Sequence, residues 1–398
     1  MGLNSTPNAI RKHIAFFGLR NAGKSSLVNA VTNQDIAVVS DVKGTTTDPV
    51  YKSMELLPLG PVVIIDTPGF DDEGDLGKKR VNKTMQILAK TDIAVLVSDA
   101  SREFTKDEKD IIDIFKKKNI PYIIAFNKCD LIKDNRALDD NVIYTSAKKG
   151  INIDALKEKL SNVSVCDREE KRLLGDIVGE GDVVILITPI DDSAPKGRLI
   201  LPQVQAIRDA LDSNAICVVT KETTYAKTLE ILGDNVKLAV CDSQVFKLID
   251  ALTPSHIKLT SFSILMSRLK GYLKTAYQSI KTLDTITSDD KILISEGCSH
   301  HRQCGDIGTV KLPNLIKKYT GTNPVFEFTQ GTEFPSDLSP YRLVIHCGGC
   351  MLNEREVTSR MQSSIDKGIA FSNYGIAIAY MNGIIKRSTE IFPELKEL

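Results

Sequence analysis

A glycine-rich segment from Gly18 to Ser25 constrains this chain more than any other feature of its sequence. It reads GLRNAGKS and follows the apolar run HIAFF, as a phosphate-binding loop between a strand and a helix would. Successive backbone N–H groups of such a loop surround the phosphates, and the following helix adds partial positive charge. Lys24 is expected to reach the β- and γ-phosphates, and Ser25 to ligate magnesium. The expected nucleotide contacts here are Gly18, Asn21, Ala22, Gly23, Lys24, Ser25 and Ser26.

Two later segments indicate which base the nucleotide carries. Asn127, Lys128 and Asp130 follow the apolar run YIIAF, where the Asp130 carboxylate can accept hydrogen bonds from N1–H and the amine of guanine. Adenine lacks both donors and would leave the carboxylate unpaired, which can discriminate by as much as about 10⁴–10⁵. Further contacts to the base oxygen are expected from backbone N–H groups of Ser146, Ala147 and Lys148. The predicted base is therefore guanine.

The elements between these motifs supply the expected magnesium and γ-phosphate contacts. Asp66 closes the apolar run PVVIID, which places its carboxylate to hold magnesium, through water. The backbone N–H of Gly69 is expected near the γ-phosphate. The polar segment GTTTD at 44–48 carries hydroxyls that could complete the magnesium shell when the γ-phosphate is present.

Alternating patterns predict an α/β fold throughout. From His13 to about Leu160, apolar runs alternate with helical patterns, as in a doubly wound parallel sheet. Two more sets of apolar runs and helices follow, and a helical stretch is expected over 259–280. We therefore expect three domains: a P-loop GTPase domain at 1–165, a small α/β domain at 166–265 and a third α/β domain at 266–398.

Charge and hydropathy limit the partners and the cellular location that we expect for this protein. The 51 basic and 51 acidic residues cancel, which gives no electrostatic reason to expect a nucleic-acid partner. No stretch reaches the roughly 18 apolar residues of a membrane helix, and the first residues lack the apolar core of a secretory signal. We expect a cytoplasmic protein with no membrane partner.

The eight cysteines are unevenly spread. Clustered thiols in a large chain without an export signal favour metal ligation over disulfides. Four cysteines fall in the last third of the chain, namely Cys298, Cys304, Cys347 and Cys350. The other four stand singly and are expected to be structural thiols, namely Cys129, Cys166, Cys217 and Cys241.

Two short motifs place three of these cysteines at strand ends. Cys298 and His300 follow the run ILISEG, and His346, Cys347 and Cys350 follow the run RLVI, which suits one shared site at the end of a sheet. Three thiolates suit a 4Fe–4S cluster whose fourth iron has another ligand or an exchangeable one. The candidates for that fourth position are His300, His346, Glu296 and Cys304. Structural zinc with thiolates and histidine, or cysteines without any ligand, remain alternatives.

The nucleotide motifs resemble those of the translation-factor-related GTPases, especially the bacterial tRNA-modification GTPase branch, which shares the form GxxNAGKSS and a GTT-Asp switch. The resemblance implies that Asn21 helps bind potassium and that Thr46 ligates magnesium. Phe70 follows DTPG, so the water-orienting glutamine of Ras-like proteins is missing there. Hydrolysis is expected to be slow and potassium-stimulated, since unassisted GTPases turn over at about 10⁻⁴–10⁻² per second.

The whole chain resembles HydF, the family of maturation GTPases of FeFe hydrogenases. Three features of the sequence support this resemblance: the GTPase motifs, the CxH…HCxxC pattern and the segment PIDDSAPKGRLILPQVQ. That segment is similar to the family's dimerisation domain. The resemblance implies an iron–sulfur cluster-binding third domain and a homodimeric scaffold or carrier. Such a scaffold would receive a diiron precursor made by the radical-SAM maturases HydE and HydG and deliver it to apo FeFe-hydrogenase.

Two other functions are compatible with the same residues. The first is an RNA- or ribosome-associated GTPase with a zinc-stabilised C-terminal domain, which the zero net charge disfavours. The second is a redox-sensing GTPase whose cluster reports oxygen or iron status.

Overall fold

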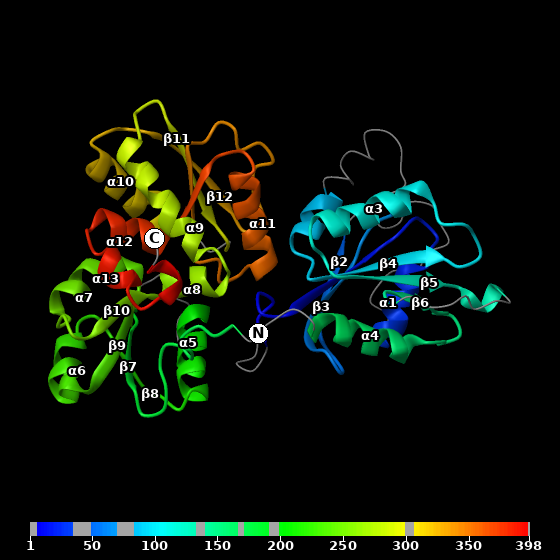
Figure 1. Ribbon diagram of the computed structural model, residues 1–398, viewed down its shortest axis with the longest axis horizontal. Coiled ribbons are helices and arrows are strands. Elements are labelled where there is room, and N and C mark those ends of the chain that lie inside the picture. Colours follow the sequence, from blue (N-terminus) through cyan, green and yellow to red (C-terminus); the bar gives the residue numbers. More distant parts are fainter. Residues whose placement is uncertain are drawn as a thin grey trace. The chain divides into compact units, whose positions relative to one another are not determined.

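Parallel strands alternating with helices form the first of two compact units, residues 1–169 and 170–398. The computed structural model describes residues 6–34, 49–69, 83–132, 140–165, 171–190, 199–298 and 306–396 (Figure 1). The first unit has a six-stranded sheet of order β2-β3-β1-β4-β5-β6, in which only β2 is antiparallel to its neighbour. Its strands are β1 Lys12–Phe17, β2 Val50–Leu56, β3 Gly60–Asp66, β4 Ile93–Asp99, β5 Tyr122–Asn127 and β6 Val142–Tyr144.

Helices cover both faces of this sheet. These helices are α1 Lys24–Thr32, α3 Lys106–Lys117 and α4 Ile153–Val165. Phe16 packs with residues of α1 and α4 in one core, whereas its neighbour Phe17 packs with α3 in another. Successive strand residues point to opposite faces, so a sheet buried on both sides needs continuous apolar runs. The doubly wound sheet expected from the sequence is confirmed.

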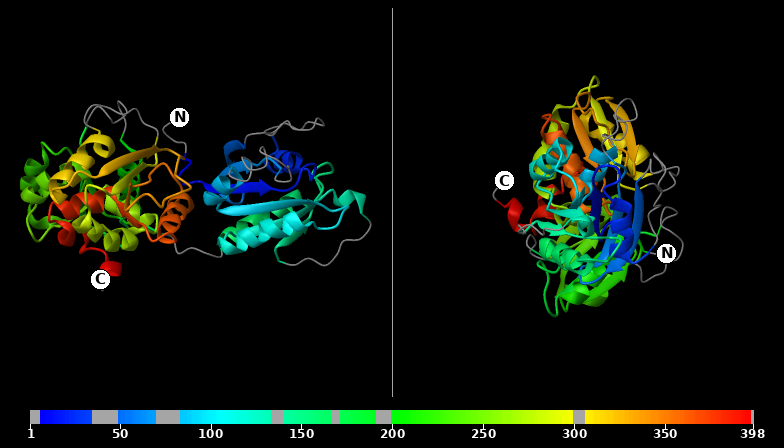
Figure 2. Two further views of the ribbon diagram at one scale, coloured as in Figure 1. Left: turned by 90° about the horizontal axis from the view of Figure 1, so that it is seen from above. Right: turned by 90° about the vertical axis from the view of Figure 1, so that its right-hand side faces the viewer.

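The second unit contains two parallel sheets of four strands each. Figures 1 and 2 show this unit in green to red. One has the order β10-β9-β7-β8 and the other β12-β11-β13-β14. The first comprises β7 Val183–Ile187, β8 Ile216–Thr220, β9 Val236–Cys241 and β10 Lys258–Ser261. The second comprises β11 Lys291–Glu296, β12 Val325–Gln330, β13 Leu343–His346 and β14 Ala370–Asn373.

A single hydrophobic core joins the two sheets. Leu186 of β7 and Ile294 of β11 are fully buried members of the same cluster of side chains. The helices around this core are α5 Leu201–Asp212, α6 Tyr225–Leu232, α7 Phe246–Leu252, α8 Phe262–Leu269, α9 Leu273–Ser279, α10 Leu312–Thr320, α11 Glu354–Ile365, α12 Tyr374–Met381 and α13 Ile385–Thr389. The boundaries expected at 165/166 and 265/266 stay a prediction, and the second of them falls within α8.

The helix expected over 259–280 is wrong in its first residues. Residues 258–261 form β10, which pairs in parallel with β9, and the helical residues that follow are divided between α8 and α9. Ser261 ends the strand and caps α8, since its Oγ accepts a hydrogen bond from the N–H of Ile264 at 3.3 Å. A strand of four residues is too short to show a period of two, and its pairing with β9 is decided by distant residues.

None of the helices in the described part of the chain combines the length and the apolar character that a bilayer crossing needs.

Candidate functional site

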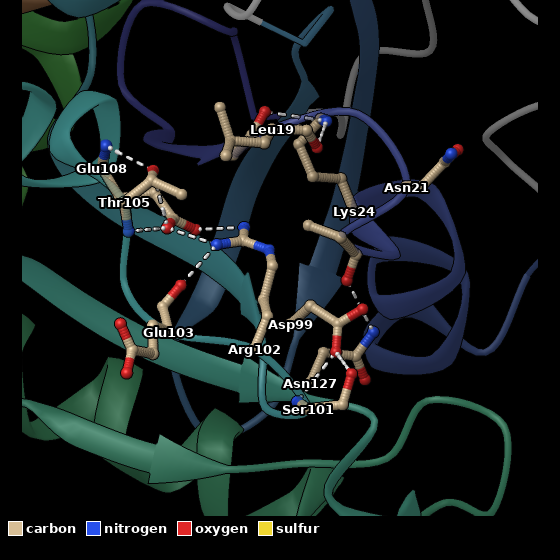
Figure 3. Close-up of polar contacts among 12 residues, drawn as sticks. Leu19, Asn21, Lys24, Asp99, Ser101, Arg102, Glu103, Thr105, Glu108 and Asn127 are labelled. Atoms are coloured by element: carbon tan, nitrogen blue, oxygen red, sulfur yellow. Dashed lines mark hydrogen bonds and ion pairs between the residues drawn. The ribbon is translucent and has the colours of Figure 1, made fainter.

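The phosphate-binding loop follows β1 and packs against the end of β4. Lys24 Nζ donates hydrogen bonds to the carbonyl oxygens of Gly18 at 2.9 Å and Leu19 at 2.8 Å (Figure 3). Gly18 has a φ of 154°, and a Cβ there would lie 2.2 Å from the carbonyl oxygen of Val97. Only glycine permits this approach. The buried ammonium can exchange two neutral carbonyls for phosphate oxygens, which bind a cation more strongly.

Ser25 and Asp66 form a pair suited to a hard dication. Ser25 Oγ donates to Asp66 Oδ2 at 2.7 Å, while the buried Asp66 Oδ1 has no hydrogen-bond partner. Burial raises the pKa of Asp66, and Ser25 and Lys24 oppose that shift. An unpaired buried carboxylate oxygen is costly, and a magnesium ion beside the serine hydroxyl would satisfy it. Gly69 follows the same strand, whereas Thr46 with the segment 44–48 and Phe70 lie outside the described residues.

Asn127 connects the phosphate loop to the segment expected at the base. Its Nδ2 donates to the carbonyl oxygen of Ala22 at 3.1 Å, and its Oδ1 accepts from the N–H of Ala147 at 3.0 Å. A Cβ at Gly23 would lie 2.3 Å from Asn127 Nδ2, and that glycine has a φ of 88°. The structure thus brings together three motifs that are far apart in the sequence.

Lys128 is fixed by an aspartate that the sequence reasoning missed. Its Nζ donates to the carbonyl oxygen of Asn21 at 2.7 Å and to Asp99 Oδ2 at 2.6 Å. Burial alone would raise the pKa of Asp99, but hydrogen bonds from Lys128 and Ser101 outweigh it and lower the pKa. Asp99 is the last residue of β4, so its position at the end of the run IAVLVSD was the available signal (Figure 3).

Asp130 is held as an ionised carboxylate beside this network. Ser146 Oγ donates to Asp130 Oδ1 at 2.6 Å, and this hydrogen bond is the main reason that the pKa of Asp130 is lowered. Ser146 Oγ also accepts from the N–H of Lys149 at 3.2 Å. The carboxylate follows β5, where it could accept the two guanine donors.

The cysteine motifs meet at the carboxyl ends of two neighbouring strands. Ser295 of β11 pairs with His346 of β13, and the N–H of Cys347 donates to the carbonyl oxygen of Ser295 at 2.9 Å. Cys347 Sγ accepts hydrogen bonds from the N–H groups of Gly297 at 3.0 Å and Gly349 at 3.4 Å. Backbone donors aimed at sulfur suit a thiolate that carries a metal cluster.

Cys350 is close to Cys347 in this loop. Burial is the main cause that raises the pKa of Cys350 to about 12, and the charge of Cys347 adds to it. The nearby ammonium of Lys270 acts in the opposite direction. Its Nζ donates to the carbonyl oxygen of Leu352 at 2.8 Å, on the loop that follows Cys350.

Two further candidate ligands, Cys298 and Glu296, lie near the hydroxyl of Tyr374. Burial raises the pKa of this phenol, and the charges of Glu296, Cys347, Asp306 and Cys298 raise it further. Its hydroxyl donates to Glu296 Oε1 at 3.4 Å. Cys298 and Glu296 therefore lie near the same buried hydroxyl as Cys347. No signal in the sequence singled out Tyr374, which begins α12 within an apolar segment.

His346 is already engaged at both ring nitrogens. Arg360 can only donate, so its Nη1 donates to His346 Nε2 at 3.3 Å, and Nδ1–H donates to the carbonyl oxygen of Cys347 at 2.7 Å. Burial, and then the charge of Arg360, lower the pKa of His346 to about 3, which keeps the ring neutral. In this arrangement neither nitrogen is open to a metal. His300, His301, Cys304 and Cys166 lie outside the described residues.

The fit of these residues to an iron–sulfur cluster rests on the chemistry of the donors. Soft thiols with N–H donors toward sulfur and a nearby carboxylate match that chemistry. Within the described ranges, no three His, Cys, Asp or Glu side chains form a group that could hold a metal ion. The structure brings Cys347 and Cys350 together and places Cys298 at the adjoining strand end. Of the cysteines expected to be structural, Cys241 is buried and Cys129 and Cys217 are partly exposed.

Three family models match successive parts of the chain. Residues 13–128 match the 50S ribosome-binding GTPase family, residues 173–271 match the hydrogen maturase F dimerization domain, and residues 274–391 match the hydrogen maturase F tetramerization domain. Tetramerization is not among the roles that the sequence predicts for the third domain, whose cysteine motifs indicate metal binding.

Curated relatives match the first unit. The tRNA modification GTPase MnmE of Thermoanaerobacter sp. (strain X514) is 36% identical over 171 residues, which are 42% of this chain and 35% of the relative. GTPase Der of Wolinella succinogenes is 34% identical over 177 residues, 40% of this chain and 37% of the relative. The chain thus spans little more than a third of the length of these relatives.

Among solved structures, Aquifex aeolicus Era bound to GDP and aluminium fluoride has 18% identity and a TM-score of 0.34, covering 56% of this chain and 98% of Era. The strand order, the phosphate loop and the guanine motif define the first unit as a P-loop GTPase domain. With its dimerization and tetramerization domains, the chain belongs to the hydrogen maturase F (HydF) family of GTPases. The resemblance drawn from the sequence is confirmed.

Proposed function

We propose that this protein is a GTP-hydrolysing scaffold that carries a 4Fe–4S cluster and a diiron precursor and delivers the precursor to apo FeFe-hydrogenase. One observation supports the proposal most directly: the same chain has a guanine-nucleotide site and a sulfur-rich site. The sulfur-rich site lies at the ends of β11 and β13. The family's maturase domains support the hydrogenase context. The expected partners are HydE, HydG and the apo-hydrogenase.

In the nucleotide site, each expected residue has a separate task. Lys24 neutralises the β- and γ-phosphate charge, and Asn127 and Lys128 keep the loop in the shape that surrounds the phosphates. Ser25, Asp66 and Thr46 would hold magnesium, which supplies charge stabilisation at the transferred phosphoryl group. Asn21 would bind potassium, and the backbone N–H of Gly69 would orient the γ-phosphate.

In the sulfur site, Cys298, Cys347 and Cys350 would hold the cluster. A cluster with one iron not bound to cysteine supplies an exchangeable coordination position. Glu296, His300 and Cys304 stay open as the fourth ligand, while the hydrogen bonds of His346 disfavour it. The chain's own part is to aim the N–H groups of Gly297 and Gly349 at Cys347.

The metal content tests the scaffold. Anaerobic protein is analysed for iron, sulfide and zinc, with EPR after reduction, alongside a Cys298/Cys347/Cys350 triple alanine variant. We expect about four irons and four sulfides per chain, with an EPR signal that the variant lacks. Stoichiometric zinc without sulfide after attempted reconstitution would contradict the proposed iron–sulfur cluster. It would favour the RNA- or ribosome-associated GTPase with a zinc-stabilised C-terminal domain.

The substitution Lys24→Ala tests the independence of the two sites. Loss of the cation that neutralises the phosphates should reduce GTP hydrolysis by a factor of about 10² or more. Because each unit has its own core, iron content should equal that of the wild type. Hydrolysis is followed by phosphate release and iron by colorimetry. Loss of both properties would show that the sites are not separate.

A further inference from the structure

One buried arginine contacts the ends of three neighbouring strands at the sulfur site. Arg360 lies on α11 and is 4% exposed. Its Nη2 donates to the carbonyl oxygen of Gly331, just after β12, at 2.7 Å, and its Nη1 donates to Ser295 Oγ of β11 at 3.3 Å. The third strand is β13, which Arg360 reaches through His346. β11 and β13 are the two strands that lead into Cys298 and Cys347.

The charge of this guanidinium is balanced nearby. Nη2 also donates to Glu356 Oε1, one turn earlier on α11, at 2.7 Å, and the guanidinium lies 5.2 Å from the ring centre of Phe334. A buried ion pair is costly to desolvate, so its retention favours a positional role over a gain in stability. Glu356 is itself fixed at the start of the helix, where its N–H donates to Asn353 Oδ1 at 3.0 Å.

Two contacts of His346, one at each ring nitrogen, agree on which nitrogen carries the proton. An arginine can only donate, so His346 Nε2 must be the acceptor and Nδ1 must carry hydrogen. That hydrogen is donated to the carbonyl oxygen of Cys347, which also accepts from Tyr272 Oη at 2.9 Å. A chain of hydrogen bonds thus runs from Arg360 through His346 to the backbone of the cysteine loop.

We propose that Arg360 is the positioning residue of the sulfur site: it selects the Nδ1–H tautomer of His346 and thereby fixes the backbone of Cys347. Its positive charge, close to the cysteine loop, also stabilises the more negative, reduced state of a bound cluster. This second consequence rests on the proposed function, whereas the tautomer does not.

The tautomer is tested in metal-free protein by ¹⁵N NMR of the histidine rings, with His346 identified by the signal that His346→Gln removes. The wild type should show His346 as the Nδ1–H form. Arg360→Met, of similar length and without donors, should give a mixture with the Nε2–H form. An unchanged Nδ1–H signal in Arg360→Met would overturn the proposal.

The charge effect is tested by EPR-monitored redox titration of the cluster-loaded protein. Arg360→Met should lower the midpoint potential, by about 59 mV for a tenfold change in the one-electron equilibrium. Glu356→Gln removes the opposing charge and should shift the potential the other way, which a merely structural disturbance would not do. Lys367→Met, with a side chain 39% exposed just beyond α11, is the matched control and should leave the potential unchanged.

One further variant and two further outcomes keep the tests of the tautomer and of the charge effect separate. Should Arg360→Met fail to fold, Arg360→Lys takes its place: it keeps the charge without spanning three strands, so the potential should stay near that of the wild type while the tautomers mix. A wild-type tautomer in that variant would contradict the positioning role. If the wild type binds no iron, the proposed cluster fails, and the NMR result alone decides the role of Arg360.

Discussion

Two carboxylates of the nucleotide site have opposite electrostatic surroundings. Asp66 is buried, which raises its pKa and leaves one oxygen unpaired, whereas a serine hydroxyl lowers the pKa of Asp130. Desolvation disfavours charge, and hydrogen bonds to the charged form favour it. The first arrangement suits a carboxylate that shares its charge with a cation, and the second suits an ionised acceptor for the donors of a base.

The substitution Asp130→Asn should change base preference. Two charge-assisted hydrogen bonds are lost, and each such bond contributes about 1.5–3 kcal/mol, so GTP affinity should fall by at least about a hundredfold. Xanthine carries an oxygen where guanine carries the amine, so the new amide should bind xanthosine triphosphate better than the wild type does. Calorimetry measures both affinities. Asp154→Asn, at a side chain 92% exposed on α4, is the control and should change neither.

The site residues that the sequence predicts stand in motifs, whereas a residue that it does not predict stands outside them. Lys24, Ser25 and Asp130 stand in motifs with fixed spacing at the ends of long apolar runs, and the structure brings the corresponding loops together. Arg360 stands in no motif. Its burial follows from lying on the same stripe of α11 as Val357 and Ser364, and a charged residue on such a stripe was the available signal.

At the scale of elements, short strands were the least predictable part of the fold. β10 and β14 have four residues each and lie between helices, so their backbones could as well continue a helix. Their pairing with β9 and β13 decides the outcome, and no local pattern reveals that pairing. The longer apolar runs, such as that of β11, were predicted because burial on both faces leaves a continuous signal.

An ion-pair network joins α8 to residues near the first and the last residue of the second unit. Arg268 donates to Asp176 and also to Glu394, in the turn Pro393–Leu395. The hydrogen bond from Arg268 is the main cause that lowers the pKa of Asp176 below 3.8. A carboxyl with a lowered folded pKa contributes stability above its unfolded pKa and loses it as pH falls through the folded pKa.

Asp176→Asn should therefore destabilise the second unit in a pH-dependent way. At neutral pH the loss should be below about 1 kcal/mol, because Asp176 is 46% exposed and solvent screens the pair. As pH falls well below 3.8, the wild type loses the same contribution and the two proteins should converge. Urea unfolding followed by circular dichroism measures the difference. A gap that stays constant with pH would show that packing, not ionisation, is responsible.

At the scale of the whole molecule, the shared core of the second unit was not predictable. The sequence suggested two separate domains, because each sheet has its own set of apolar runs. The structure buries residues of both sheets in one cluster, and that packing depends on contacts among residues distant in the sequence. Oligomerisation, in contrast, is indicated by the matched dimerization and tetramerization domains.

The edge strand β8 provides a surface for pairing with a second copy. β8 is at the end of its sheet, and its residues Ile216 and Val219 are 53% and 44% exposed. An exposed apolar edge is a template for strand addition, which natural proteins usually block with charge. The match of residues 173–271 to a dimerization domain includes this strand. We therefore expect β8 to take part in the homodimer.

The double substitution Ile216→Lys/Val219→Lys should weaken that dimer by at least about a hundredfold, because like charges brought together at an interface cost several kcal/mol. Light scattering after gel filtration measures the mass of each species. Leu248→Lys, at a residue 49% exposed on α7, is the matched control and should keep the wild-type mass. GTP hydrolysis per chain should be unchanged in both, because the nucleotide site lies in the other unit. A wild-type mass in the β8 variant would exclude this edge, and dissociation of the control as well would mean that any added charge disrupts the assembly.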